Sequence, residues 1–333
     1  MRRSRRTTAG ALLAAGTLLA TAAATAPAGA APAPGPAAGP AASPPLAASA
    51  AAQQRVRDYW TPERMRSATP LDLPAPRAGT AAAPRHQGAT ATVAPTAPTA
   101  PAPELRSFPQ PGGPWTGGGA IVKTSGRVFF TFNGRNASCS GDAVTSANGS
   151  TVLTAGHCVK YQGSWHTNWT FVPGYHDGQT PYGTWTASKT LTTPQWEASE
   201  EMNYDVGAAV VGTLDGKRLT DVVGGQGVQF NGAYNEDMYA FGFPAASPYD
   251  GTKLIHCSGR SSKDFLLTQD HGLGCNMTGG SSGGPWFASF DEAGGTGLQA
   301  SVNSFGYTFL PNRMFGPYFG DEVKALYERA AGT

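Results

Sequence analysis

The sequence predicts an all-β domain of short antiparallel strands, closed by one C-terminal helix and preceded by a long leader rich in alanine and proline. Residues 27–103 hold 16 of the 27 prolines, and Tyr59 and Trp60 are their only aromatic residues. Such a stretch cannot bury a sizeable core, and we expect it to be largely disordered. All four cysteines and nearly all the tryptophan and phenylalanine lie beyond residue 107, so one globular domain is expected there.

From residue 128 onward, β-branched or aromatic runs alternate with Gly, Asn, Pro or Asp, which is typical of strands joined by turns. The predicted strands are 128–132, 151–154, 184–190, 206–211, 238–242, 265–268, 285–289 and 299–304. Near the end, Val323, Leu326, Tyr327 and Ala330 lie at i, i+3, i+4 and i+7, which predicts an amphipathic helix. Strands of this kind suit a double barrel or a sandwich.

Residues 1–30 have the pattern of a secretory signal peptide. Four arginines among the first six residues precede an apolar run from about Ala9 to Ala24, and the small residues Ala28-Gly29-Ala30 follow. A basic start, a short apolar run and a small-residue site are typical of exported proteins. The run is too short and too rich in alanine for a membrane anchor. We expect a secreted, extracellular protein, exported by the general or the twin-arginine route.

Charge divides the chain in the same way as composition. Residues 1–117 carry 11 arginines against 4 acidic residues, a net charge of +7, whereas residues 118–333 carry 13 basic against 18 acidic residues, a net charge of −5. A mildly acidic domain has no electrostatic footprint for nucleic acid or for an anionic membrane. Neither is expected as a partner once the signal is removed, and we expect a monomer.

We expect residues 31–117 to be a propeptide that is cut off, and residues 118–333 to be the mature domain. The leader behind the signal is basic and the domain is acidic, so the two attract each other weakly. An island of aromatic and charged residues at 59–65 either docks on the domain, where it masks a cleft or assists folding, or is a plain spacer. The first mature residue should lie between Arg106 and Arg127.

Four cysteines in an exported domain predict two disulfides. Three connectivities are possible for Cys139, Cys158, Cys257 and Cys275. Pairing sequence neighbours would close two loops of similar size, each contributing about 3 kcal/mol in the chain-entropy model. No C-x-x-C spacing occurs, which argues against a zinc site.

Two segments have the residue content of a nucleophilic active site. Residues 151–158 read T-V-L-T-A-G-H-C, an apolar strand that ends in small residues and places His157 at its end. Residues 279–285 read G-G-S-S-G-G-P, which embeds Ser282 among glycines. Glycines let backbone N–H groups turn toward a common point, as an oxyanion site requires.

A serine hydroxyl becomes a nucleophile when a neighbouring base takes its proton, and that base needs a carboxylate to hold its tautomer. Residues 204–211 read Y-D-V-G-A-A-V-V, so Asp205 opens an apolar strand. The acids Asp177, Asp215 and Asp221 lie in glycine-containing or polar stretches, which makes Asp205 the preferred partner. His166, His176, His256 and His271 have no metal-ligand spacing, and we expect them at the surface.

T-A-G-H-C, Y-D-V-G-A-A-V-V and G-x-S-G-G-P in this order resemble the chymotrypsin-like serine protease family, within it the bacterial secreted branch that includes the glutamyl endopeptidases. The resemblance covers about residues 128–331. It implies two six-stranded antiparallel β-barrels with a C-terminal helix, and a site in the cleft between the barrels. It also implies a catalytic triad of His157, Asp205 and Ser282, together with the Cys139–Cys158 bridge.

By the same resemblance, the N–H groups of Gly280 and Ser282 form the oxyanion hole. Ser304-Phe305-Gly306 resembles the family's Ser-Trp-Gly edge strand, where a substrate backbone pairs as an added antiparallel strand. A core strand end is the alternative for these three residues. No metal or organic cofactor is implied, and the expected partners are a protein or peptide substrate and the chain's own propeptide.

The chain departs from the family at three positions. Ser281 replaces the acid that precedes the nucleophile in many members, so an ion pair with a new N-terminus is not available there. Asn276 lies where trypsin-like members carry the aspartate of the specificity pocket, and a neutral amide cannot offset a buried Lys or Arg charge. Asn303 stands where glutamate-preferring relatives usually carry histidine. Neither charged specificity is supported.

The leading interpretation is a secreted serine endopeptidase. Two alternatives remain open at this point: a secreted homologue that binds without catalysis, and a serine esterase on the same scaffold.

Overall fold

The computed structural model describes residues 39–75, 87–96 and 108–333. The chain divides into residues 1–37 and residues 38–333, and all the described positions belong to the second unit. The predicted signal peptide therefore lies outside the described residues. Within the described ranges, no helix is long and apolar enough to cross a membrane.

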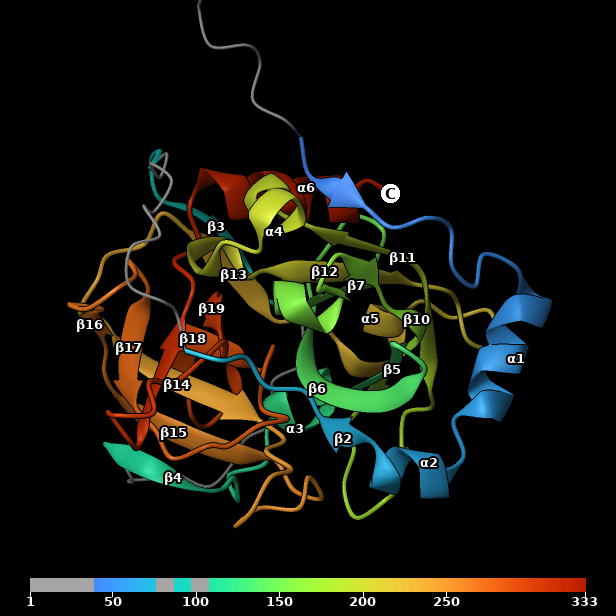
Figure 1. Ribbon diagram of the computed structural model, residues 1–333, viewed down its shortest axis with the longest axis horizontal. Helices are drawn as coiled ribbons and strands as arrows, with labels where there is room; N and C mark the ends of the chain where they lie inside the picture. The colour runs from blue at the N-terminus through green and yellow to red at the C-terminus, as the bar shows by residue number, and fades with distance from the viewer. Residues whose placement is uncertain (1–38, 76–86, 97–107) are drawn as a thin grey trace, which may run out of the picture. The chain divides into compact units, whose positions relative to one another are not determined.

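Six antiparallel strands close into the first barrel (Figure 1). They are β5 (Ser125–Phe132), β6 (Arg135–Val144), β7 (Thr151–Thr154), β10 (Thr167–Pro173), β11 (Trp185–Thr192) and β12 (Gly207–Val211). Their order is β11-β10-β5-β6-β7-β12, and β11 also pairs with β12. Val128, Phe171 and Leu191 are among the fully buried residues of its core. Closure leaves these six strands without a free edge between them, which makes this barrel a rigid support.

A second sheet system forms the other half of the domain. The strands β13 (Gly227–Phe230), β14 (Asp237–Gly242), β15 (Ile255–Arg260), β18 (Pro285–Asp291) and β19 (Thr296–Val302) join in the order β13-β19-β18-β14-β15. At its ends this sheet is extended by β3 (Ala91–Val93) and β4 (Gln110–Pro114). A three-stranded sheet of β16 (Ser262–Lys263), β17 (His271–Gly274) and β20 (Arg313–Gly316) completes this half.

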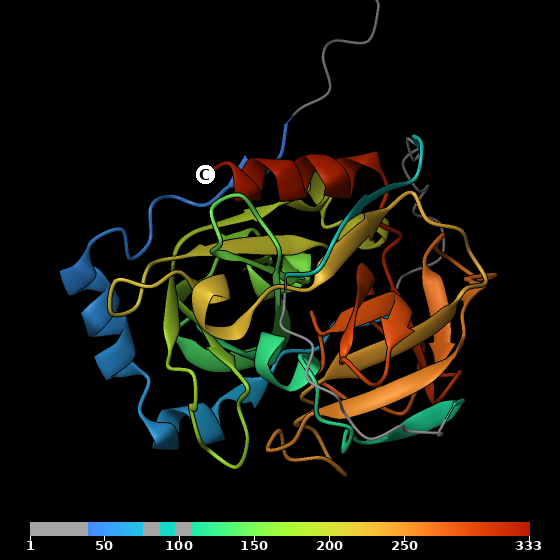
Figure 2. The same cartoon turned by 180° about the vertical axis from the view of Figure 1, so that it is seen from behind.

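The predicted C-terminal helix is α6 (Asp321–Ala331), and it buries all four residues of the predicted apolar face. Seen from behind in Figure 2, it lies along one side of the domain, and its apolar face joins the core that contains Val228 and Phe230 of β13. Asp321 and Glu322 occupy its first turn, where negative charge favours the helix dipole. The expectation of a β double barrel with a C-terminal helix is confirmed.

The remaining short elements connect the strands. They are α3 (Ile121–Thr124), η1 (Gly156–Cys158), β8 (Lys160–Tyr161), β9 (Ser164–Trp165), α4 (Pro194–Ser199), η2 (Met202–Tyr204) and α5 (Leu219–Val223). η1 follows β7 directly, and η2 precedes β12. These two turns of helix therefore lie at neighbouring strand ends of the first barrel, η1 after β7 and η2 before β12.

Part of the leader packs on the first barrel. It contains β1 (Ala41–Ala42), which pairs with β11, then α1 (Ala50–Tyr59), α2 (Pro62–Ser67) and β2 (Thr69–Pro70), which pairs with β6. Figure 1 shows α1 and α2 on the outside of this barrel. Trp60 and Met65 are buried against Phe129 of β5. The island at 59–65 therefore docks on the domain and is not a plain spacer.

The expectation of a largely disordered leader is wrong for residues 39–75, and also for β3 and β4, which lie within residues 31–117 and pair with β13 and β15. Composition averages over many alanines and prolines and hides the few apolar side chains that find partners on the domain. Tyr59 adds a polar contact, since its hydroxyl donates to Asn136 Oδ1 at 2.7 Å. Burial of such side chains against a preformed surface offsets the entropy of ordering the segment.

The predicted strand at 265–268 is also wrong. This stretch is a loop built around Asp264, whose carboxylate accepts hydrogen bonds from the N–H groups of Leu266 and Thr268. Phe265 is 72% exposed, so the aromatic residue that suggested a strand does not enter a core. Conversely, the sequence pattern does not predict β6, because Asn136, Ser138 and other polar residues interrupt its apolar pattern.

The structure joins Cys257 of β15 to Cys275, and we predict a measurable loss of stability when this bond is removed. The double variant Cys257→Ser/Cys275→Ser should lower the free energy of unfolding by about 3 kcal/mol, since the bond closes a loop in the unfolded chain. Chemical denaturation measures this best in a Ser282→Ala background that prevents self-cleavage. An unchanged transition midpoint would contradict the prediction.

Candidate active site

Strand pairing in the first barrel brings His157 and Asp205 together. β7 and β12 are antiparallel neighbours, with Thr154 opposite Gly207. His157 follows the end of β7 in η1, and Asp205 precedes the start of β12. Because antiparallel neighbours place the end of one strand beside the start of the other, residues that are 48 positions apart become adjacent.

The Asp205 carboxylate is the most heavily hydrogen-bonded group of the site. Its Oδ2 lies 2.8 Å from His157 Nδ1, and its Oδ1 accepts the His157 backbone N–H at 2.7 Å. The Ser304 hydroxyl, from the other half of the domain, donates to Oδ2 at 2.6 Å. His157 and Asp205 are fully buried. This geometry holds the His157 ring with Nδ1 toward the acid and Nε2 toward the cleft.

A second histidine supports His157 from behind. His166 lies at hydrogen-bond distance from the His157 backbone, with its Nε2 donating to the carbonyl oxygen at 2.8 Å. Its ring stacks on Phe130, with ring centroids 4.3 Å apart. Burial lowers the pKa of His166 to about 3, despite the hydrogen bond to the His157 backbone. His166 is therefore neutral, and it places no positive charge beside His157.

The expectation that the other histidines lie at the surface is wrong for three of the four. His166, His256 and His271 are buried, and only His176 is exposed. Each of the three packs against aromatic rings, which a neutral imidazole tolerates well. A lone histidine in a polar stretch of sequence carries no signal for such packing.

Ser282 lies in a tight turn that only glycine permits. Gly280 and Gly283 have φ angles of +94° and +81°, which other residues rarely adopt. A Cβ on Gly283 would also lie 2.1 Å from Thr154 Oγ1 of the first barrel. Within the described chain, neither the Gly280 nor the Ser282 N–H donates a hydrogen bond. Both groups therefore retain their capacity to bind an oxyanion.

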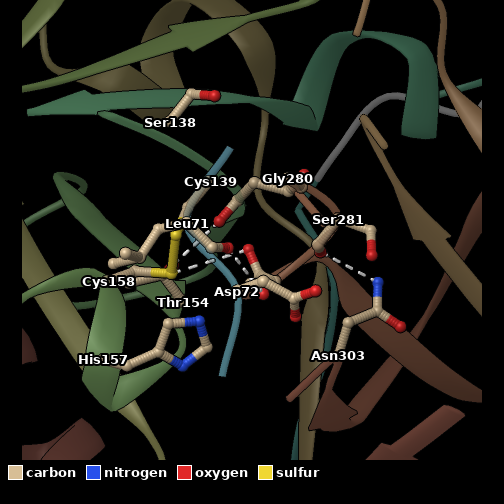
Figure 3. The surroundings of a disulfide bond; sticks show 12 residues. Leu71, Asp72, Ser138, Cys139, Thr154, His157, Cys158, Gly280, Ser281 and Asn303 are labelled. Atoms are coloured by element: carbon tan, nitrogen blue, oxygen red, sulfur yellow. Dashed lines mark hydrogen bonds between the residues drawn. A yellow bond between two sulfur atoms is a disulfide. The ribbon is translucent and has the colours of Figure 1, made fainter. Parts of the chain in front are cut away.

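The first barrel holds this turn through Ser140, a residue that the sequence analysis missed. The Ser140 hydroxyl donates to the Gly280 carbonyl at 2.9 Å, and the Ser140 N–H donates to the Ser282 carbonyl at 2.7 Å. The neighbouring Cys139 is joined to Cys158, so the disulfide, His157 and the serine turn form one cluster (Figure 3). Nothing in the sequence distinguishes Ser140 from other strand serines.

The leader enters the same cluster. The Ser282 hydroxyl lies 3.4 Å from the Leu71 carbonyl oxygen, to which it donates. His157 Nε2 is buried and has no hydrogen-bond partner among the described residues. The structure thus brings His157 and Asp205 into a hydrogen bond, whereas the Ser282 hydroxyl is engaged by the leader.

A pocket beside Ser282 contains all four of the predicted substrate-binding residues, namely Asn276, Ser304, Phe305 and Gly306. Asn276 Oδ1 accepts a hydrogen bond from the Tyr249 hydroxyl at 2.6 Å, a partner that the sequence analysis did not identify. The Cys257–Cys275 bond directly precedes Asn276 and fixes the backbone there. The amide is therefore held by the wall of the pocket.

The segment 304–306 forms a free edge. Phe305 exchanges both backbone hydrogen bonds with Phe315, and its side chain is buried against Trp196 and Tyr307. By contrast, the Ser304 carbonyl and both backbone groups of Gly306 have no hydrogen-bond partner in the part of the chain that the structure describes. Such an edge can accept an added strand.

One group of potential metal ligands lies here, formed by Cys139, His157 and Cys158. It does not fit a metal ion, because both sulfur atoms belong to the disulfide and the thiolate is the form that binds metal. His157 Nδ1 is in addition occupied by Asp205. We therefore derive no chemical step through a metal at this position.

Two solved structures resemble the chain closely over the folded domain. The protease Anisep from Arthrobacter nicotinovorans is 47% identical, with a TM-score of 0.61, and the match covers 64% of this chain and 98% of that one. The thermostable serine protease AL20 from an extremophilic microorganism is 40% identical with the same TM-score of 0.61, covering 64% and 99%. A Glu endopeptidase, 16% identical at a TM-score of 0.52, covers 66% of this chain and 96% of its own and shares the fold.

The curated protein that matches is named an extracellular metalloprotease, from Bacillus subtilis strain 168. It is 27% identical over 182 residues, which are 52% of this chain and 54% of that protein. This chain thus spans about half the length of that relative. No protein-family model matches the chain.

Identities of 47% and 40% to the two proteases, over nearly their whole lengths, agree with the double-barrel fold. The chain belongs to the chymotrypsin-like serine proteases.

Proposed function

We propose that this chain is a secreted serine endopeptidase that hydrolyses peptide bonds through an acyl-enzyme, with His157, Asp205 and Ser282 as its triad. The observation that supports it most is the buried hydrogen bond between His157 Nδ1 and Asp205 Oδ2 at 2.8 Å. It leaves Nε2 as the ring nitrogen that faces the cleft. Two disulfides are compatible with an oxidising, extracellular compartment.

In the proposed mechanism, His157 Nε2 takes the proton from the Ser282 hydroxyl as the oxygen attacks the scissile carbonyl. The carbonyl oxygen becomes an oxyanion, which accepts hydrogen bonds from the Gly280 and Ser282 N–H groups. His157 then donates the proton to the leaving amine, and water releases the acyl group by the same steps in reverse. Asp205 holds the His157 tautomer and stabilises the imidazolium that forms.

The free edge at Ser304 and Gly306 favours a peptide over a small ester as the substrate. A backbone that pairs with this edge gains main-chain hydrogen bonds that a short ester cannot make. A homologue that binds without catalysis has no need of the Ser304 hydroxyl on Asp205 or of the neutral His166 behind His157. The free edge thus supports the endopeptidase over the esterase, and the contacts of Ser304 and His166 support it over the homologue without catalysis.

We further propose that the leader is a propeptide, so that the mature enzyme begins between Arg106 and Arg127. The described leader covers Ser282, which is only 3% exposed. Removal of the leader would open the cleft. The mature domain would then be monomeric, with protein or peptide as its substrate.

We predict that Ser282→Ala lowers kcat on a peptide substrate by roughly 10⁶-fold, because the nucleophile is lost while the binding surfaces remain. The fold should persist, since the Ser282 side chain makes no contact that holds the two halves together. Circular dichroism and mass spectrometry of the two disulfides check the fold.

The same experiment identifies the nucleophile directly. A fluorophosphonate should label Ser282 of the processed wild-type enzyme and should not label the Ser282→Ala variant. Covalent labelling at any other residue would overturn the triad assignment.

The pocket yields a prediction about specificity. Asn276→Asp would place a carboxylate at the wall of the pocket, where the Tyr249 hydroxyl can still donate to it. We expect the ratio of kcat/KM for Lys or Arg over leucine at the scissile bond to rise at least about tenfold, or 1.4 kcal/mol. Asn235→Asp adds the same charge at an exposed position outside this pocket and is the matched control. An equal change in both variants would show that pocket charge does not set the preference.

A further inference from the structure

We propose that residues 69–75 of the leader act as an inhibitor that lies in the cleft with its chain direction opposite to that of a substrate. The leader segment therefore blocks the enzyme without being cleaved by it. This inference rests on the proposed function, because it needs Ser282 as the nucleophile.

The N-terminal end of this segment lies on the side of the first barrel. β2 pairs with β6 in parallel, with Thr69 opposite Ala137 and Pro70 opposite Ser138. The Leu71 N–H then donates to the Ser138 carbonyl at 3.0 Å. At the next step the Leu71 carbonyl accepts the Ser282 hydroxyl at 3.4 Å. Leu71 thus lies between β6 and the nucleophile.

Asp72 lies in the middle of the cleft. Figure 3 shows it between His157 and the turn of Gly280 and Ser281. A Cβ on Gly279 would lie 3.3 Å from the Asp72 Cβ. Burial raises the pKa of the Asp72 carboxyl, and the charge of His157 lowers it in part. The Asp72 side chain nevertheless remains exposed to solvent, whereas the neighbouring Leu73 is buried.

The C-terminal end lies on the other side, beside the free edge. Leu73 is buried against Trp196 and Phe305. Together with Pro74 and Ala75 it lines the pockets on this side of the cleft. From Thr69 to Ala75 the chain thus runs from Ser138 toward Phe305.

A substrate has to run the other way. If its backbone pairs antiparallel with residues 304–306, its acyl part passes Gly306 first and Ser304 last. The scissile carbonyl then meets Ser282, and the leaving part departs toward the disulfide and Ser138. The leader follows this path in reverse. Accordingly, within the described residues it makes no backbone hydrogen bond with Ser304 or Gly306.

The reversed chain direction changes which peptide groups lie beside Ser282. In a reversed peptide, the amide nitrogen of the scissile bond would lie on the side of the cleft that the acyl part of a substrate occupies. The reversed backbone also does not pair with the edge at residues 304–306, which would position a scissile carbonyl. The Leu71 carbonyl accordingly accepts a hydrogen bond from the Ser282 hydroxyl. With its proton directed to that oxygen, the hydroxyl is not available to His157 Nε2, which has no partner among the described residues.

The side chains themselves do not select a direction. Residues 70–74 read P-L-D-L-P, the same sequence from either end, so Asp72 has a leucine and a proline on both sides. The direction is set upstream, where Trp60 is buried and its Nε1 donates to the Asn168 carbonyl at 2.6 Å. Since α2 ends at Ser67, only Ala68 separates the helix from Thr69, and the chain must enter the cleft from β6.

The direction is testable by disulfide trapping in the full chain carrying Ser282→Ala. Thr69→Cys combined with Ala137→Cys should form a new bond on mild oxidation, because these residues are opposite each other in the parallel pair. Thr69→Cys combined with Gly306→Cys should not, although a substrate-like direction would place residue 69 near Gly306. Peptide mapping by mass spectrometry reads both. Bonding of the second pair alone would overturn the proposal.

The inhibition is tested in the full chain with Ser282 intact. Fluorophosphonate labelling of the uncleaved chain should be at least tenfold slower than labelling of the processed enzyme, and the released leader should contain no cut within residues 70–74. Equal labelling rates, or a cut in that stretch, would overturn this inference and leave the proposed protease intact. Absence of labelling even after processing would instead contradict the proposed function.

Two variants of the leader and one control variant test which contacts cause the inhibition. Leu73→Ala, which removes the contact with Trp196 and Phe305, and Trp60→Ala, which removes the upstream anchor, should each speed labelling of the uncleaved chain at least tenfold. Glu63 of α2 is exposed, and the Glu63→Gln control should leave the labelling rate unchanged. If either variant fails to fold, the trapping experiment still decides the direction. An unchanged rate in both folded variants would overturn the role of these contacts.

Discussion

The Asp205 carboxylate accepts three hydrogen bonds inside a fully buried site, and the surrounding structure is arranged to provide them. Two come from His157 and one comes from Ser304, in the opposite half of the domain. A buried charge without partners costs several kcal/mol, whereas each hydrogen bond to a charged group contributes about 1.5–3 kcal/mol. The carboxylate therefore requires both halves to be in place, and it couples the orientation of the His157 ring to the packing of the two sheets.

The serine turn depends on the same junction. Ser140 of the first barrel holds the carbonyls of Gly280 and Ser282, and Gly283 lies so close to Thr154 that no side chain fits. His157 and Asp205 thus belong to one half of the domain, whereas Ser282, the proposed nucleophile, lies in a turn of the other half that is held by hydrogen bonds across the junction. The closed first barrel is rigid, and it therefore fixes the position of the serine turn relative to His157 and Asp205.

The leader occupies the surfaces at which we propose that a substrate binds, but it is positioned by contacts far from Ser282. Trp60 and Met65 pack on the outside of the first barrel, and this anchoring determines where the chain enters the cleft. A short segment of symmetrical sequence then occupies the site in the direction that its tether allows. The proposed inhibition requires no special side chain beside Ser282, since the direction of the chain alone would separate an inhibitor from a substrate.

The sequence alone determined the fold class, the C-terminal helix and the identity of the candidate triad residues, because strand periodicity, glycine content and the local motifs around His157, Asp205 and Ser282 are properties of neighbouring residues. The tertiary structure alone decided the rest. Ser140, His166 and Tyr249 act on the site from positions that no local pattern marks, and the loop at 265–268 and the helices of the leader depend on where apolar side chains find a surface. The direction of residues 69–75 is the clearest case: P-L-D-L-P reads the same from both ends, so only the anchoring of the preceding helices on the barrel could decide it.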